Sequence, residues 1–134
     1  MESRDPERKD YRKEAMEFWA QARADLATAN TLMDAGIYYA SVFFSQQAAE
    51  KALKAAVSEC QQRSPKGHNL VHLANSLNAP ISVMNAAAEL NPEFLQSRNP
   101  DAADGIPALL YDQGSAHFHL DCAKEIVTWA KELI

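Results

Sequence analysis

The sequence predicts an all-α protein, built as one antiparallel up-and-down bundle of four to five helices that takes in residues 1–134. Two long segments, 9–34 and 37–62, contain neither glycine nor proline. Apolar residues recur in them at spacings of three and four, which places these residues on common helix faces. No run alternates apolar and polar residues in the way that a half-buried strand does. A chain of 134 residues is also long enough to close one hydrophobic core.

The first long helix is expected from about Lys9 to Asp34. Gly36 follows where a terminator is expected, because glycine readily adopts the left-handed conformation that closes a last helical turn. So short a connection between two segments of similar length predicts an antiparallel hairpin. Residues 1–8, ahead of this helix, are expected to be flexible. One face of the helix carries Phe18, Ala22, Leu26, Ala29 and Met33.

The second long helix, from about Ile37 to Gln62, is expected at the centre of the bundle because its apolar residues do not keep to one stripe. A helix that is apolar on two sides needs partners on both. This spread of apolar residues also predicts a homodimer, since a lone bundle of this size leaves part of such surface uncovered. One face carries Val42, Ala49, Leu53, Ala56 and Cys60, and the other carries Phe44, Ala48, Ala52 and Ala55.

Shorter helices are expected next. Residues 64–67 form a loop, after which Asn69 can cap a short helix with an apolar side made of Leu70, Leu73 and Leu77. Pro80 then opens another short helix that runs to about Leu90.

The remaining chain predicts a stub, a loop and a long closing helix. Asn91 and Pro92 have the pattern of a cap followed by a first-turn proline, which predicts a helical stub through Phe94. Residues 96–107 are expected as a loop. The closing helix is expected from about Gln113 to Ile134, with one apolar face made of Ala116, Leu120, Ala123, Val127, Ala130 and Ile134.

Composition and charge exclude several classes of protein. With 47% hydrophobic and 23% charged residues, and no apolar run near the roughly 20 residues of a membrane span, we expect a soluble protein without a membrane partner. A formal net charge of -5 argues against broad, charge-driven adhesion to nucleic acid. The charged N-terminus lacks the apolar core of a secretory signal, so we expect the cytoplasm. Cys60 and Cys122, far apart and each in a helical pattern, are expected as reduced core residues.

The densest polar cluster lies within the apolar second helix, at Gln46, Gln47, Glu50, Lys51 and Lys54. Gln47, Lys51 and Lys54 share one helix face. Two interpretations stay open for this cluster. It is a polar groove that binds a phosphate or a partner protein, or it is a solvated stripe that contains a Glu50–Lys54 pair in the favourable i to i+4 order.

The loop that holds Arg98 and Asp101 is the second candidate site. Arginine can hold a phosphate or a carboxylate with two parallel hydrogen bonds, and loops often carry function. The alternative is that both residues fasten the loop, with Asp101 accepting a hydrogen bond from a nearby backbone amide.

Familiar catalytic and cofactor motifs are missing. His68 and His72 have the i to i+4 spacing of two metal ligands, but they lack the glutamate of an HExxH zinc site, and His68 is expected just outside the helix. His117 and His119 point about 200° apart on a helix and cannot act together. There is no G-x-S-x-G motif and no glycine-rich phosphate loop. We therefore expect no metal, no cofactor and no self-sufficient metal or covalent-catalysis enzyme.

Residues along nearly the whole chain are similar to those of one family, the HEPN domains, which are named for nucleotide binding in higher eukaryotes and prokaryotes. The most specific part is the run from Gln46 to Lys54, QQAAEKALK. The other matching residues are Trp19, Ala22, Asp25, Leu26, Ala29, Gly36, Tyr38, Tyr39, His68, Leu70, Leu73, Arg98, Asn99, Pro100, Asp101, Ala123, Glu125, Ile126 and Trp129.

The resemblance implies an antiparallel bundle of four or five helices, commonly dimeric and often encoded beside a minimal nucleotidyltransferase in toxin–antitoxin-like pairs. Some HEPN members are metal-independent ribonucleases, in which an arginine holds the scissile phosphate and a histidine, with four to six residues between the two, transfers a proton. The positions at that distance after Arg98 are Ala103, Asp104 and Gly105, so the motif is absent there. Arg63 and His68 match the spacing, but they lie between the second and third helices, and we interpret that match as a coincidence.

We therefore expect a non-catalytic HEPN-type subunit that pairs with a nucleotidyltransferase and binds a nucleotide or nucleic-acid phosphate. The alternatives are a HEPN ribonuclease toxin with an atypical active site and a dimeric scaffold whose only ligand is another protein. The polar face of the second helix and the Arg98 loop are expected to form one recognition surface. Its candidate residues are Gln47, Glu50, Lys51, Lys54, His68, Arg98 and Asp101.

Overall fold

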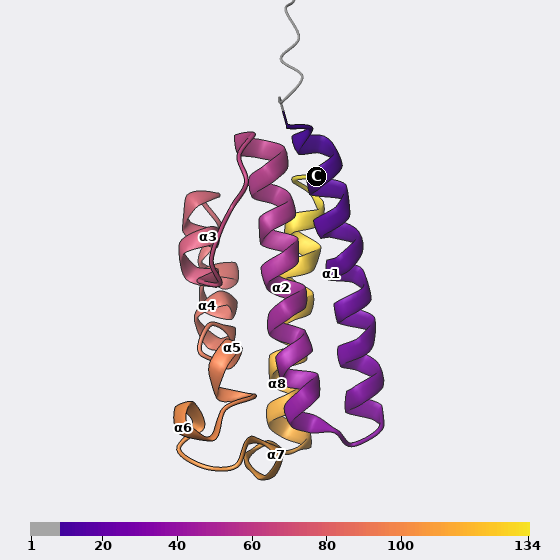
Figure 1. The fold of residues 1–134 in the computed structure, drawn as a ribbon, viewed down its shortest axis with the longest axis vertical. Helices are drawn as coiled ribbons and strands as arrows, with labels where there is room; N and C mark the ends of the chain where they lie inside the picture. The colour runs from indigo at the N-terminus through magenta and orange to yellow at the C-terminus, as the bar shows by residue number, and fades with distance from the viewer. Residues whose placement is uncertain (1–8) are drawn as a thin grey trace, which may run out of the picture.

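A computed structural model of the chain describes residues 9–134, and in that range it contains helices and no strand. The all-α antiparallel bundle is confirmed (Figure 1). The expected flexibility of residues 1–8 lies outside the described residues. The helices are α1 (Tyr11–Asp34), α2 (Tyr38–Gln61), α3 (Leu70–Ser76), α4 (Ile81–Leu90), α5 (Glu93–Gln96), α6 (Pro100–Ala103), α7 (Pro107–Leu110) and α8 (Gln113–Lys131).

Helices α1 and α2 form the predicted antiparallel hairpin (Figure 1). The side chain of Asp10 caps α1 by accepting a hydrogen bond of 3.0 Å from the backbone N–H of Lys13. The turn between the helices needs Gly36, whose φ of 78° lies in the left-handed region that favours glycine. A buried hydrogen bond of 2.8 Å from the Ser41 hydroxyl to the carbonyl of Ala29 then joins the two helices.

Helix α2 is central, as predicted, because α1 and α8 pack on it together with the shorter helices α3, α5 and α7. Alanines on its buried faces let these neighbours approach closely, and the core around it is filled by Leu53, Val57, Leu70, Leu90 and Ile126. The expectation that both cysteines are core residues is half wrong. Cys122 is buried, whereas Cys60 is exposed because it lies near the end of α2, beyond the buried part of the helix.

The short helices begin close to their predicted positions, with one difference at Asn91. Asn69 caps α3 by accepting a hydrogen bond of 3.0 Å from the backbone N–H of His72. Asn91 does not cap the next stub. Its side-chain oxygen accepts a hydrogen bond of 2.8 Å from the backbone N–H of Leu70, so it satisfies a free donor of the first turn of α3 instead.

The expectation of a loop over residues 96–107 is wrong in part, because the segment contains α6 and runs into α7. Each of these single-turn helices begins at a proline, whose fixed φ suits a first helical position. Asp112 then begins α8 with a capping box to Ser115, and the helix ends at Lys131 rather than at Ile134. None of the helices in residues 9–134 combines the length and apolar character that a membrane span needs.

Candidate functional site

A buried glutamate lies at the middle of the candidate site. Glu50 is 1% exposed, and its carboxylate has partners on both oxygens. Oε1 accepts hydrogen bonds from Gln46 Nε2 at 3.2 Å and His68 Nδ1 at 2.8 Å. Oε2 lies 3.2 Å from the ammonium group of Lys54 and 3.7 Å from that of Lys51. The Glu50–Lys54 pair is therefore confirmed.

The interpretation of this face of α2 as a solvated stripe is wrong in part. Gln46, Glu50 and Lys54 are buried, with His68 on Glu50 and Phe18 of α1 beside Lys54, whereas Gln47 and Lys51 are partly exposed. A charged side chain is stable in such a place only when it is paired and hydrogen-bonded. The polar residues of the QQAAEK run therefore form an internal network that fastens His68 to α2.

The carboxylate of Glu50 is ionised in this network. Burial alone would raise its pKa, since an apolar surrounding disfavours the charged form. The hydrogen bond from His68, the positive charge of Lys54, the hydrogen bond from Gln46 and the charge of Lys51 together outweigh burial, so the pKa of Glu50 lies below its ordinary value. A carboxylate can only accept, so His68 donates to it through Nδ1 and leaves Nε2 uncommitted.

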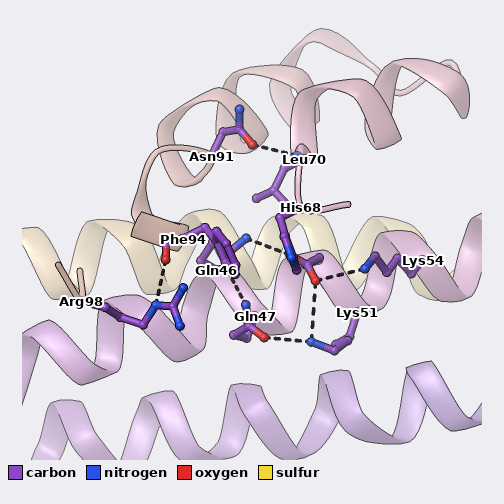
Figure 2. A network of polar contacts seen from close by, with 10 residues as sticks. Gln46, Gln47, Lys51, Lys54, His68, Leu70, Asn91, Phe94 and Arg98 are labelled. Carbon is purple, nitrogen blue, oxygen red and sulfur yellow. Dashed lines mark hydrogen bonds and ion pairs between the residues drawn. The ribbon is translucent and has the colours of Figure 1, made fainter. Parts of the chain in front are cut away.

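His68 lies between α2 and α3, outside the helix, as expected. Its imidazole stacks on the ring of Phe94 at 3.8 Å between centroids and 15° between planes, and 49% of the side chain is exposed (Figure 2). His72 does not join it. Among residues 9–134 no group of three or more metal-ligating side chains comes together. Among the described residues no hydrogen-bond partner is found for Nε2 of this half-exposed side chain.

Arg98 lies on the same aromatic ring. Its guanidinium carbon is 4.5 Å from the ring centroid of Phe94 and 4.8 Å from that of Phe43, and its Nε donates to the carbonyl of Phe94 at 2.9 Å. Figure 2 shows Phe94 between His68 and Arg98. The residue is exposed, so its terminal nitrogens can still donate to a ligand. Arg98 is thus both fastened to the protein and open to solvent.

The other candidate residues are placed less favourably for a ligand. Gln47 donates to Gln46 at 2.7 Å and accepts from Lys51 at 2.8 Å, so both groups of its amide are engaged. Lys51 lines a shallow hollow that also contains Glu14 and Glu17, whose charges oppose an anion. Asp101 is exposed on α6, and no hydrogen bond or ion pair joins its side chain to this network in the described part of the chain.

A second polar cluster was not predicted from the sequence. The buried carboxylate of Glu93 accepts a hydrogen bond from the hydroxyl of Tyr111, and Nε2 of His119 lies 3.7 Å from its other oxygen. His119 Nδ1 contacts the carbonyl of Ser115 at 2.7 Å, which makes Nδ1 a donor. The cluster joins α5 to α8 and to the segment between α7 and α8. Only the i to i+4 spacing of Ser115 and His119 was visible in the sequence.

The fold and the site together define a class of protein. It is a helical bundle whose central helix carries a buried polar network, with exposed hydrogen-bond donors at the edge of that network. The profile of the HEPN domain matches residues 15–133, and the chain belongs to the HEPN family. The predicted resemblance is confirmed.

Solved structures agree with this assignment. A crystal structure of a protein from Thermus thermophilus is 30% identical with a TM-score of 0.83, and the match covers 90% of this chain and 98% of the other. An archaeal HEPN homologue is 32% identical with a TM-score of 0.78, over 88% and 95% of the two chains. A HEPN domain protein from Thermotoga maritima is 26% identical with a TM-score of 0.69, over 87% and 96%. Comparison with functionally curated proteins finds no match.

Proposed function

We propose that this HEPN domain is a non-catalytic binding subunit that pairs with a nucleotidyltransferase and binds the phosphate of a nucleotide or nucleic acid. The observation that carries the proposal is the ring of Phe94, which the His68 imidazole and the Arg98 guanidinium both contact. Given these two distances, the two groups lie at most about 8 Å apart. Charge-assisted hydrogen bonds are about 2.8 Å long, so two such bonds to different oxygens of one phosphate bridge a separation of this order.

Fewer residues contact the phosphate in this proposal than in the recognition surface expected from the sequence. In this proposal Arg98 and the Nε2 atom of His68 make the direct contacts, and Lys51 adds a partly exposed charge beside Glu50. Glu50 and Lys54 are buried, so they act from beneath by fixing His68 and α2. Lys51 and Lys54 offset the charge of Glu50, whereas Glu14 and Glu17 beside Lys51 oppose an anion, so Arg98 supplies the positive charge that favours one.

A ribonuclease is the second candidate function, and one observation favours it. A buried carboxylate orients His68 through Nδ1, and the side chain is 49% exposed, which is an arrangement that a general base can have. The family spacing after Arg98 argues against it, since Ala103, Asp104 and Gly105 offer no histidine. Incubation with single-stranded and structured RNA in chelator distinguishes the two: intact RNA supports the binding subunit, and cleavage that His68→Ala abolishes supports the ribonuclease.

We also propose a homodimer. Three large apolar residues of α7 and the turn before it are exposed, with Leu109 at 78%, Ile106 at 58% and Leu110 at 53%. Phe118 of α8 is exposed as well. Large apolar residues that gather on an exposed surface often mark an interface with a partner. Light scattering coupled to size exclusion should report about twice the 14.8 kDa chain mass, and a monomer at micromolar concentrations would contradict the proposal.

Calorimetry tests the phosphate site. ATP and a short RNA are titrated into the parent protein, His68→Ala and Arg98→Ala. Each contact is a hydrogen bond to a charged group, so each substitution should weaken binding about ten-fold or more. Arg63→Ala is the matched control, because Arg63 is an exposed arginine whose Nε donates to Gln61 rather than to this network. Folded variants that bind as tightly as the parent would refute the site. Co-purification with a nucleotidyltransferase encoded beside the protein tests the pairing.

A further inference from the structure

Helices α1 and α8 leave an open groove that the phosphate site does not use. Both helices pack on α2, and α1 makes few contacts with α8. The groove between them has a volume of about 400 Å³. Its apolar floor is made of Trp19, Leu26 and Val127.

Positive charge is the only charge in this groove. Arg23 and Lys131 line it from α1 and α8, and none of the lining residues is acidic. Among residues 9–134 no ion pair joins either cation to a carboxylate. One turn away on α1, Arg23 has only apolar neighbours, which include Trp19 and Ala27, so no partner is available along its own helix. The groove therefore offers two cations and no acidic lining residue to pair with them.

The shape of the groove indicates what it can hold. Its lining residues on α1 run from Trp19 to Asn30, which is about 16 Å or three helical turns. Ala27 is exposed and small, so it allows a backbone to approach closely. Met16, which is 41% exposed and lies one turn before Trp19, extends the apolar stripe. An apolar floor of this length between two helices is suited to a third helix laid along it.

We propose that the groove between α1 and α8 binds an acidic amphipathic helix of another protein. The apolar residues of that helix would contact Trp19, Leu26 and Val127, and its acidic flanks would pair with Arg23 and Lys131. Charge complementarity selects this occupant over a basic or neutral helix, and it speeds the encounter of the partners. The proposal does not rest on the phosphate site, which lies on the α2, α5 and loop residues described above.

Two synthetic helical peptides of about three to four turns test the proposal with the full-length protein. Both carry leucines along one face, flanked by glutamates in one peptide and by lysines in the other. Fluorescence anisotropy should show that the acidic peptide binds and that the basic peptide does not. Amide shifts of the labelled protein should change along the α1 and α8 groove. Equal binding of both peptides, or shifts confined to other surfaces, would overturn the proposal.

Variants separate charge from shape. Arg23→Glu and Lys131→Glu should each weaken the acidic peptide about ten-fold, because each replaces an attraction by a repulsion. Ala27→Trp should weaken it by filling the groove without changing the charge. Arg63→Glu carries the same charge change outside the groove and should leave the affinity unchanged. An equal loss of peptide affinity in Arg63→Glu would show only a general effect of charge. Dissociation of a homodimer by Arg23→Glu would assign the groove to a second copy of the chain. Either result refutes the proposal.

ATP affinity measured on the same variants distinguishes this inference from the proposed function. Arg23→Glu should lose the peptide and keep ATP, whereas Arg98→Ala should lose ATP and keep the peptide.

Discussion

Replacing Glu50 with glutamine removes a negative charge from the interior and leaves the size of the side chain almost unchanged. The parent carboxylate accepts from His68 at 2.8 Å and pairs with Lys54 at 3.2 Å. Glutamine keeps one acceptor oxygen, but its amide group points a donor toward groups that are donors themselves. The ammonium group of Lys54 is then left in a buried place without its counter-charge.

The magnitude follows from these contacts. Removing one member of a buried ion pair costs about 3 to 5 kcal/mol of unfolding free energy. Because glutamine can still accept one hydrogen bond, we expect the lower end, about 3 kcal/mol at pH 7. The difference between parent and variant should shrink on acidification. A carboxyl whose pKa is lowered by folding stabilises the protein above its unfolded pKa of about 4.3, and this contribution is lost as the pH falls through the lower folded value.

Urea unfolding followed by far-ultraviolet circular dichroism, at pH 7 and at several values below pH 4.5, measures both quantities. Glu17→Gln is the matched control, since Glu17 is exposed on α1 and its replacement should change stability by about 0.5 kcal/mol at most. A Glu50→Gln protein within about 1 kcal/mol of the parent at pH 7 would show that the network does not hold the charge as argued.

Three further outcomes are expected. Leu53→Ala should lower the free energy of unfolding by about 2 to 5 kcal/mol in urea titrations, because Leu53 of the central helix α2 is fully buried; a loss under 1 kcal/mol would contradict that packing. Iodoacetamide at pH 8 should label Cys60 and leave Cys122 largely unmodified in mass spectra. Cys60 is exposed, whereas burial and nearby carboxylates raise the pKa of Cys122 to about 11. Equal labelling of both cysteines would contradict the burial of Cys122. Burial raises the pKa of Tyr111, and its hydrogen bond to Glu93 and the charge of Glu93 raise it further, so the stability that Tyr111 contributes should fall as the pH rises above the ordinary tyrosine pKa of about 10. Thermal melts of Tyr111→Phe should show a smaller loss of stability at alkaline pH. An alkaline profile that does not change in this variant would argue against the contact between Tyr111 and Glu93.

The long helices were predictable because their signals are local. Apolar spacing fixes the faces of α1, α2 and α8, and Gly36 and Asn69 mark turns and caps through their own backbone and side-chain chemistry. The single-turn helices α6 and α7 were not predictable, since four residues are too short to show a period. Asn91 was misassigned because its oxygen bonds to Leu70, a partner that is distant in sequence.

The candidate site was predictable in its residues and not in its burial. The QQAAEK run indicates that Glu50 belongs to the candidate site. Only the fold shows that His68 contacts the Glu50 carboxylate and that Glu50 is buried. The stacking of Arg98 on Phe94 and Phe43 likewise depends on how α5 lies against α2. Cys60 has the spacing of a core residue, and its exposure follows from where the neighbouring helices end.

Side-chain NMR during an ATP titration tests the central claim most directly. The account predicts saturable shifts of the His68 ring nitrogens and of the Arg98 guanidinium at one common affinity, which weakens with salt because screening acts over about 8 Å at physiological ionic strength. Either substitution, His68→Ala or Arg98→Ala, should weaken the response of the remaining residue about ten-fold or more. Shifts that do not saturate, or a His68 response that is unchanged in Arg98→Ala, would contradict the claim that these two side chains bind one phosphate.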